Sequence, residues 1–149
     1  MGLQPAVLIN TDVNTFRREL NLAQWAHPLV HANTHRPDLI VMKHAIDHHK
    51  RLKGDLSTKW TKDPALVLAK RGNDVVGGYA VVDGELLGLW GFGIGDWLVR
   101  AAVRDGATHL DCFDGWLPQF YKHNGFRETL REPNYNRGGP SVVFMRAQP

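Results

Sequence analysis

Hydrophobic and polar positions in the first third of the chain predict one strand followed by two helices. Residues 6–10 form a short apolar run that is typical of a strand. From Val13 to about Ala32 apolar residues recur at helical spacing, and Pro28 must kink or end this helix. A second helix is expected from Asp38 to Leu52, with Gly54 as its terminator.

The pattern then changes to strands separated by turns. Apolar runs at 65–69, 75–82 and 85–90 each have strand length and composition. Arg71–Asp74 forms the first turn, and Asp83-Gly84 is a strong signal for a hairpin. These three segments are therefore expected to form an antiparallel meander.

A glycine-rich turn at 91–95 leads into a helical pattern that begins at about Asp96 and ends at Arg104, and residues 108–113 form the next strand. The order strand, tight turn, helix, strand indicates a parallel crossover. A short helix at 116–124 and strands at 127–131 and 141–145 complete the chain. We expect an α/β (α+β) fold with a mixed, mostly antiparallel twisted sheet flanked by helices.

Composition places the chain among ordinary single-domain globular proteins. The 149 residues predict one domain, 1–149, and a formal net charge of +3 without a dense basic patch argues against nucleic acid as a partner. No apolar run approaches membrane-spanning length, and the N-terminus lacks the regions of a signal peptide. The single cysteine, Cys112, excludes an internal disulfide. We expect a cytoplasmic protein that does not bind membranes.

Two short motifs point to chemistry. The segment Gly93-Ile94-Gly95-Asp96-Trp97-Leu98 places two glycines where an apolar run becomes a helix, and the free N–H groups of such a helix start bind phosphate. The alternative is a glycine turn needed only for packing, with Asp96 as an ordinary N-cap. The segment from Phe120 to Phe126 then places a phenol, Tyr121, one strand and one loop further on.

The element order and both motifs resemble the GNAT superfamily of acyl-CoA-dependent N-acyltransferases over nearly the whole chain. Gly93 and Gly95 match the glycines of its Gln/Arg-x-x-Gly-x-Gly/Ala loop, and 120–126 matches its aromatic-Tyr-x-x-x-Gly-Phe signature. Residues 110–115 and 140–145 resemble small uncharacterised members, some of them phage-borne.

One position departs from the family's pattern. The Gln/Arg of the loop is replaced by Trp90, and no Lys or Arg occurs between Arg71 and Arg100. A pyrophosphate at this loop would therefore rely on backbone N–H groups and the helix dipole, unless basic residues approach from elsewhere in the fold.

The resemblance implies acetyl-CoA as co-substrate and a small-molecule or protein amine as acceptor, and it leaves a homodimer open. It also implies that backbone N–H groups near Leu89 polarise the thioester carbonyl, and that a splay between the strands of Leu89 and Cys112 admits the pantetheine arm. The residues expected to bind the cofactor are Leu89, Trp90, Gly91, Gly93, Ile94, Gly95 and Asp96.

Three residues are candidates for proton transfer. Tyr121 is the expected general acid to the leaving thiolate, the alternative being a packed aromatic whose hydroxyl bonds to backbone. Glu85 and Asp114 are candidate bases, directly or through water, although both also suit turn positions. Cys112 could be proposed as a nucleophile, but its apolar strand favours a buried, inert thiol.

The histidines suggest a further class of site. His44 and His48 are four residues apart, as zinc ligands on a helix can be, but no third ligand is evident and no metal is predicted. If the first helices border the acceptor groove, as they often do in this family, either histidine could serve the substrate. The rival to an enzyme is a GNAT-shaped binding or inhibitory protein without turnover, which the missing loop cation favours. ADP-ribosyl transfer has no visible motif.

Overall fold

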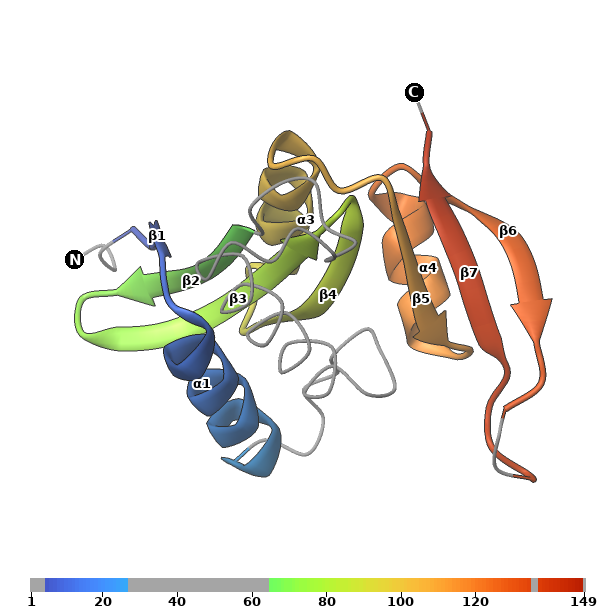
Figure 1. Cartoon of the computed structure of the whole chain (residues 1–149), viewed down its shortest axis with the longest axis horizontal. Helices are drawn as coiled ribbons and strands as arrows, with labels where there is room; N and C mark the ends of the chain where they lie inside the picture. The colour runs from blue at the N-terminus through green and yellow to red at the C-terminus, as the bar shows by residue number, and fades with distance from the viewer. Residues whose placement is uncertain (1–4, 27–64, 135–136, 149) are drawn as a thin grey trace, which may run out of the picture.

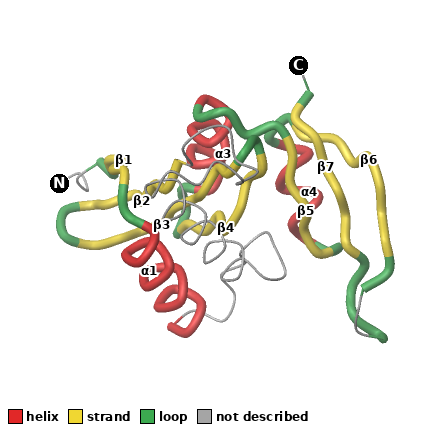
Figure 2. Tube along the Cα trace, in the orientation of Figure 1, coloured by secondary structure: helices red, strands yellow, loops and turns green. Residues whose placement is uncertain are grey.

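A computed structural model describes residues 5–26, 65–134 and 137–148, and these form one seven-stranded sheet with three helices (Figures 1 and 2). The strands lie in the order β1-β2-β3-β4-β5-β7-β6. In chain order the elements are β1 Val7–Asn10, α1 Val13–Ala26, β2 Ala65–Arg71, β3 Asp74–Val82, β4 Glu85–Gly91, α3 Gly95–Arg104, β5 His109–Phe113, α4 Trp116–His123, β6 Phe126–Glu132 and β7 Val142–Ala147.

The strands β2 to β4 form the expected antiparallel meander, and β1 pairs antiparallel with β2 at its outer edge. The hairpin between β3 and β4 turns at Asp83 and Gly84, whose φ angles of 51° and 83° suit a tight two-residue loop. In β4, Gly88 also has a positive φ of 55°, and the register with β3 shifts between Gly78 and Ala80. This shift marks a bulge in the middle of β4.

The sheet changes character between β4 and β5. These strands are parallel, and their ladder holds the single pair Glu85 and His109. The start of β5 is attached to the β3–β4 hairpin, because the Thr108 N–H donates to the Gly84 carbonyl at 2.7 Å. Beyond this point β4 and β5 diverge, and β5, β7 and β6 form a second antiparallel half (Figure 1).

Side chains alternate between two cores on opposite faces of the sheet. One core lies under α3 and α4 and the other under α1. The first includes Val67, Tyr79, Leu89, Leu98, Leu110, Cys112, Tyr121 and Met145, and the second includes Phe16, Leu20, Leu68, Leu87 and Trp90. Because the side chains alternate, a shift of one residue in the pairing register of β4 would move each of its side chains to the opposite face of the sheet.

The fold class is confirmed, and so is the order of the elements that the structure describes. The crossover from β4 through α3 to β5 is parallel, as expected. The predicted extension of the first helix beyond Ala26, the helix at 38–52 and the pair His44 and His48 lie outside the described residues.

Candidate functional site

The glycine loop and the start of α3 border a pocket of about 500 Å³. Gly93 has a φ of 77°, and a Cβ added to it would meet no atom of the described residues within 4 Å. The N-cap of α3 is Ile94, which makes no side-chain capping hydrogen bond. The first N–H groups of α3 therefore lack a side-chain acceptor at the position where one is usual, which suits an anionic ligand.

Basic residues from outside the loop reach this pocket. Arg71, the last residue of β2, and Arg100, in the second turn of α3, both line it together with Gly93 and Ile94. The absence of Lys and Arg from positions 72–99 thus does not leave the loop without cations. Sequence spacing could not show this, because the two arginines belong to separate elements.

Asp96 is not the helix N-cap, contrary to the alternative raised from the sequence. It is the second residue of α3, and its exposed carboxylate accepts a 2.8 Å hydrogen bond from the side-chain amide of Asn124, at the end of α4. This bond draws one carboxylate oxygen toward α4.

Gly95 has a packing role. A Cβ at this position would lie 3.0 Å from Cζ and 3.1 Å from Cε1 of Phe120. The two glycines of the motif therefore differ: Gly93 faces open space, while Gly95 allows α4 to pack against the start of α3.

Tyr121 is fully buried, and within the described structure its hydroxyl has no hydrogen-bond partner. Its ring is held edge-on between Phe120 and Phe126, with centroids 5.1 Å and 5.8 Å away. Burial raises the pKa of Tyr121 well above its ordinary value of 10, and the neighbouring Cys112 contributes in the same direction. Within the part of the chain that the structure describes, the hydroxyl thus lacks the backbone partner expected of a merely packed tyrosine.

Glu85 is a titratable group with a strongly shifted pKa. It is the first residue of β4 and is half-buried. Its burial, together with the Asp111 carboxylate, raises its pKa to about 7. Its strand partner His109 has a lowered pKa, caused by burial and then by Arg146. Glu85 is therefore poised near neutrality, where a general base is most effective.

Asp114, the other candidate base, is engaged in an ion pair. Its carboxylate lies 2.7 Å from Nη1 of Arg131 and accepts the Gly115 N–H at 3.0 Å. Arg131 also contacts Glu128 at 2.6 Å. These contacts connect the end of β5 to β6 and give Asp114 a structural role.

The remaining predicted residues lie on both faces of the sheet. Trp90 is 2% exposed and packs against Phe16 under α1, so any contact it makes with a cofactor would come from its backbone. Leu89 points into the opposite core. Cys112 is buried, and burial raises its pKa to about 12, as expected for an inert thiol.

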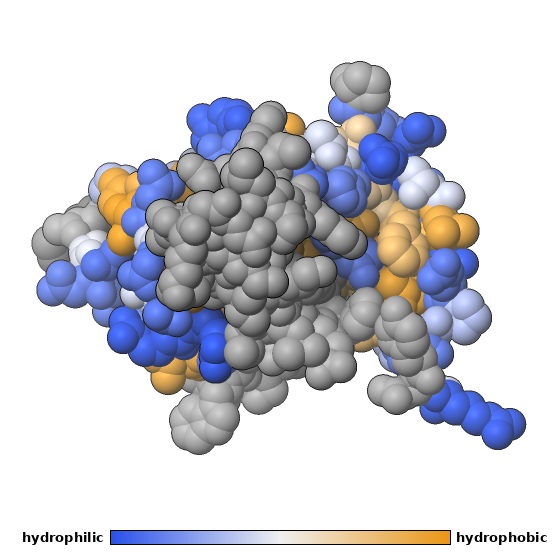
Figure 3. Space-filling model, in the orientation of Figure 1, coloured by the Kyte–Doolittle hydropathy of each residue, from blue (hydrophilic) through white to orange (hydrophobic). Residues whose placement is uncertain are grey.

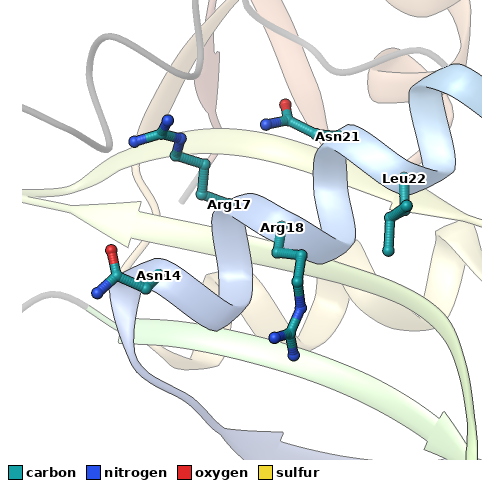
Figure 4. Close-up of a pocket in the computed structure, with 5 residues that line it drawn as sticks. All are labelled: Asn14, Arg17, Arg18, Asn21 and Leu22. Atoms are coloured by element: carbon teal, nitrogen blue, oxygen red, sulfur yellow. The ribbon is translucent and has the colours of Figure 1, made fainter.

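A second pocket, of about 620 Å³, lies along α1 (Figure 4). Figure 4 shows Arg17 and Asn21 projecting to one side of the helix and Arg18 and Leu22 to the other, with Asn14 near the helix start. The sequence analysis did not single out this pocket, although the helical spacing of its four polar lining residues could have shown that they lie close together.

Apolar side chains gather over β7 and β6 at the right of Figure 3, and Leu130 of β6 is 53% exposed. Among the described residues, no group of three or more His, Cys, Asp or Glu could hold a metal ion. No helix in this part of the chain is long and apolar enough to span a membrane.

Solved structures of acetyltransferases resemble this chain along most of its length. A putative GNAT-family acetyltransferase from Desulfovibrio desulfuricans aligns with a TM-score of 0.60 and 15% identity, covering 96% of this chain and 98% of that one. A spermidine N-acetyltransferase SpeG chimera from Vibrio cholerae and hSSAT gives 0.59 and 12%, covering 97% and 95%.

A third neighbour, from Salmonella typhimurium, modifies the N-terminal serine of ribosomal protein L7/L12. It gives a TM-score of 0.55 and 16% identity, covering 97% of this chain and 94% of that one. No protein family model matches the sequence, and no curated protein matches it. At these identities the likeness establishes architecture, and the chain has the fold of the GNAT acetyltransferases.

Proposed function

We propose that this protein transfers an acetyl group from acetyl-CoA to an amine. The observation that carries the proposal is the hydroxyl of Tyr121, which is buried beside Cys112 of β5 and has no partner in the described structure. A buried hydroxyl without a hydrogen bond costs about 1–3 kcal/mol. A ligand atom that accepts its proton would remove that cost.

Three features of the backbone suit a CoA molecule. Gly93 and the uncapped start of α3 would hold the pyrophosphate. The divergence of β4 from β5 after one pair would admit the pantetheine arm, which can hydrogen-bond to a strand as an added strand does. The bulge at Gly88 would turn backbone N–H groups of β4 toward the thioester carbonyl.

The chemistry that acetyl-CoA supplies when bound is an acetyl group activated as a thioester. Tyr121 keeps its proton on Oη at all ordinary pH values, because its pKa is raised, and donates this proton toward the leaving sulfur. Glu85, ionised above about pH 7, accepts the proton of the acceptor amine through water. Asp114 takes no part, because Arg131 holds its carboxylate.

The acceptor lies, in this proposal, on the α1 side of the sheet. The two structural neighbours with stated acceptors act on a polyamine and on a protein N-terminus. The guanidinium groups of Arg17 and Arg18 would disfavour a polycation near α1 and favour an acceptor that also carries a negative charge. A suitable panel therefore compares spermidine, an N-terminal serine peptide and an amine with an acidic tail.

Calorimetric titration with acetyl-CoA, followed by assay of CoA release with this panel, tests the proposal. We expect one molecule bound per chain and CoA release with at least one amine. The absence of detectable binding at millimolar acetyl-CoA would contradict the proposal. Binding without turnover of any amine, and without hydrolysis, would instead identify a non-catalytic binding protein.

A further inference from the structure

Two arginines line the pocket beside the start of α3. Arg71 comes from the end of β2, where it is half-buried, and Arg100 is exposed on α3. Gly93 and Ile94 of the loop line the same pocket. Two cations from separate elements thus share a cavity with the backbone expected to bind phosphate.

The charge balance of this pocket favours an anion. Asp96 is its one acidic lining residue among those described, and this carboxylate already accepts the Asn124 amide. Within the described part of the chain Arg100 forms no ion pair. The charge of Arg100 is therefore not balanced by a described carboxylate, and an anion in the pocket would balance it.

We propose that Arg71 and Arg100 contact the pyrophosphate of CoA and supply the cations that the glycine loop lacks, an inference that rests on the proposed function. The loop position where a basic or amide side chain is expected holds the buried Trp90. The planar fork of arginine donates paired hydrogen bonds to phosphate oxygens, which a backbone cradle alone does not. The nucleotide half of CoA, and not its acyl end, is then what these residues recognise.

Calorimetry with three ligands and matched variants tests the assignment. CoA, 3′-dephospho-CoA and pantetheine share the thiol arm, and the first two also share the pyrophosphate. Arg100→Gln should weaken binding of CoA and 3′-dephospho-CoA equally, by about 10- to 100-fold, the range for a lost hydrogen bond to a charged group. Pantetheine binding should not change, and Arg100→Lys should restore part of the loss.

Arg127→Gln is the control, because Arg127 is exposed on β6, in the other half of the sheet. It should leave all three affinities unchanged. Arg71 is tested separately with Arg71→Lys. Lysine keeps the positive charge at this half-buried position, where a neutral side chain could disturb the structure. Raising the salt concentration should weaken CoA binding more in wild type than in Arg100→Gln.

Several outcomes would overturn the assignment. If the effect of Arg100→Gln disappears with 3′-dephospho-CoA, the arginine recognises the 3′-phosphate and not the pyrophosphate. If pantetheine binding falls equally, or if Arg127→Gln has the same effect, the role is structural or a general effect of charge. If wild type binds none of the three ligands and releases no CoA, the proposed function itself has failed.

Discussion

At the scale of single residues, the proposed role of the Tyr121 hydroxyl can be tested by removing it. Tyr121→Phe keeps the ring between Phe120 and Phe126 and removes only the hydroxyl, which has no hydrogen-bond partner among the described residues. We expect kcat to fall by about 10²–10⁴, the range for a lost positioned acid, while the affinity for CoA changes little. The free energy of unfolding without ligand should rise by about 1 kcal/mol. Single-turnover rates and denaturant unfolding measure the two effects.

Tyr79 is the matched control for this substitution. It is equally buried, but its hydroxyl donates a 2.5 Å hydrogen bond to the Asp105 carboxylate. Tyr79→Phe should lower the free energy of unfolding by about 1–3 kcal/mol and leave kcat unchanged. The opposite signs of the two stability changes separate a partnered hydroxyl from an unpartnered one. Full activity of Tyr121→Phe would show that its phenol only packs.

Glu85 should set the pH dependence of the reaction. As a base it must be ionised, so kcat/KM should rise as the pH passes through about 7. Glu85→Gln should remove this rise and lower kcat/KM by about 10²–10⁴ at the plateau. The assay uses an acceptor amine of low pKa, which stays neutral over this pH range, so that the pH profile reports a group of the enzyme and not the amine. An unchanged profile in the variant would exclude Glu85 as the base.

The same shift predicts the pH dependence of stability. The pKa of Glu85 is raised from 4.5 to about 7, so the folded chain holds a proton in this interval that the unfolded chain releases. The free energy of unfolding should therefore fall as the pH rises through the interval. Because Glu85 is partly exposed, we expect Glu85→Gln to raise Tm by only about 2–4 °C above pH 7, and by less below 4.5. Equal changes at both pH values would contradict the shift.

At the scale of elements, the sequence predicted strands, turns and helices well wherever local pattern determines them. The Asp83-Gly84 hairpin and the start of α3 near Gly95 follow from turn chemistry and hydrophobic periodicity. What it could not predict were contacts between elements, such as Phe120 against Gly95 or Arg131 with Asp114. These depend on how α4 and β6 dock, which no local pattern specifies.

The contact between Gly95 and Phe120 can be tested by a double-mutant cycle. Gly95→Ala improves helix propensity but places a Cβ 3.0 Å from the ring of Phe120. The substitution should be less favourable in wild type than in a Phe120→Leu background, by about 1 kcal/mol in the free energy of unfolding. Additive effects would show that the two residues do not restrict each other. The cycle also separates packing from ligand binding at the glycine loop.

At the scale of the whole molecule, the sheet consists of two antiparallel halves joined at one end. The single pair between Glu85 and His109 and the hydrogen bond from Thr108 to Gly84 make this junction. The sequences of β4 and β5 gave no sign of the divergence, because both burial patterns are ordinary for paired strands: β4 is buried on both faces, and β5 alternates buried with half-buried positions. Only the resemblance to a known fold implied it.

The divergence predicts where a ligand would alter hydrogen exchange. If the pantetheine arm lies between the halves, amides in 87–91 of β4 and 110–113 of β5 should exchange more slowly when CoA is added. At a CoA concentration about 100 times Kd, binding stabilises the folded state by about 2.7 kcal/mol, so the slowing can reach about 100-fold. Amides of β6 serve as an internal control, because this strand forms the far edge of the sheet. Equal slowing in all strands, β6 included, would show only that CoA stabilises the whole fold and would not support this placement, whereas slowing confined to the diverging strands would place the ligand between the two halves.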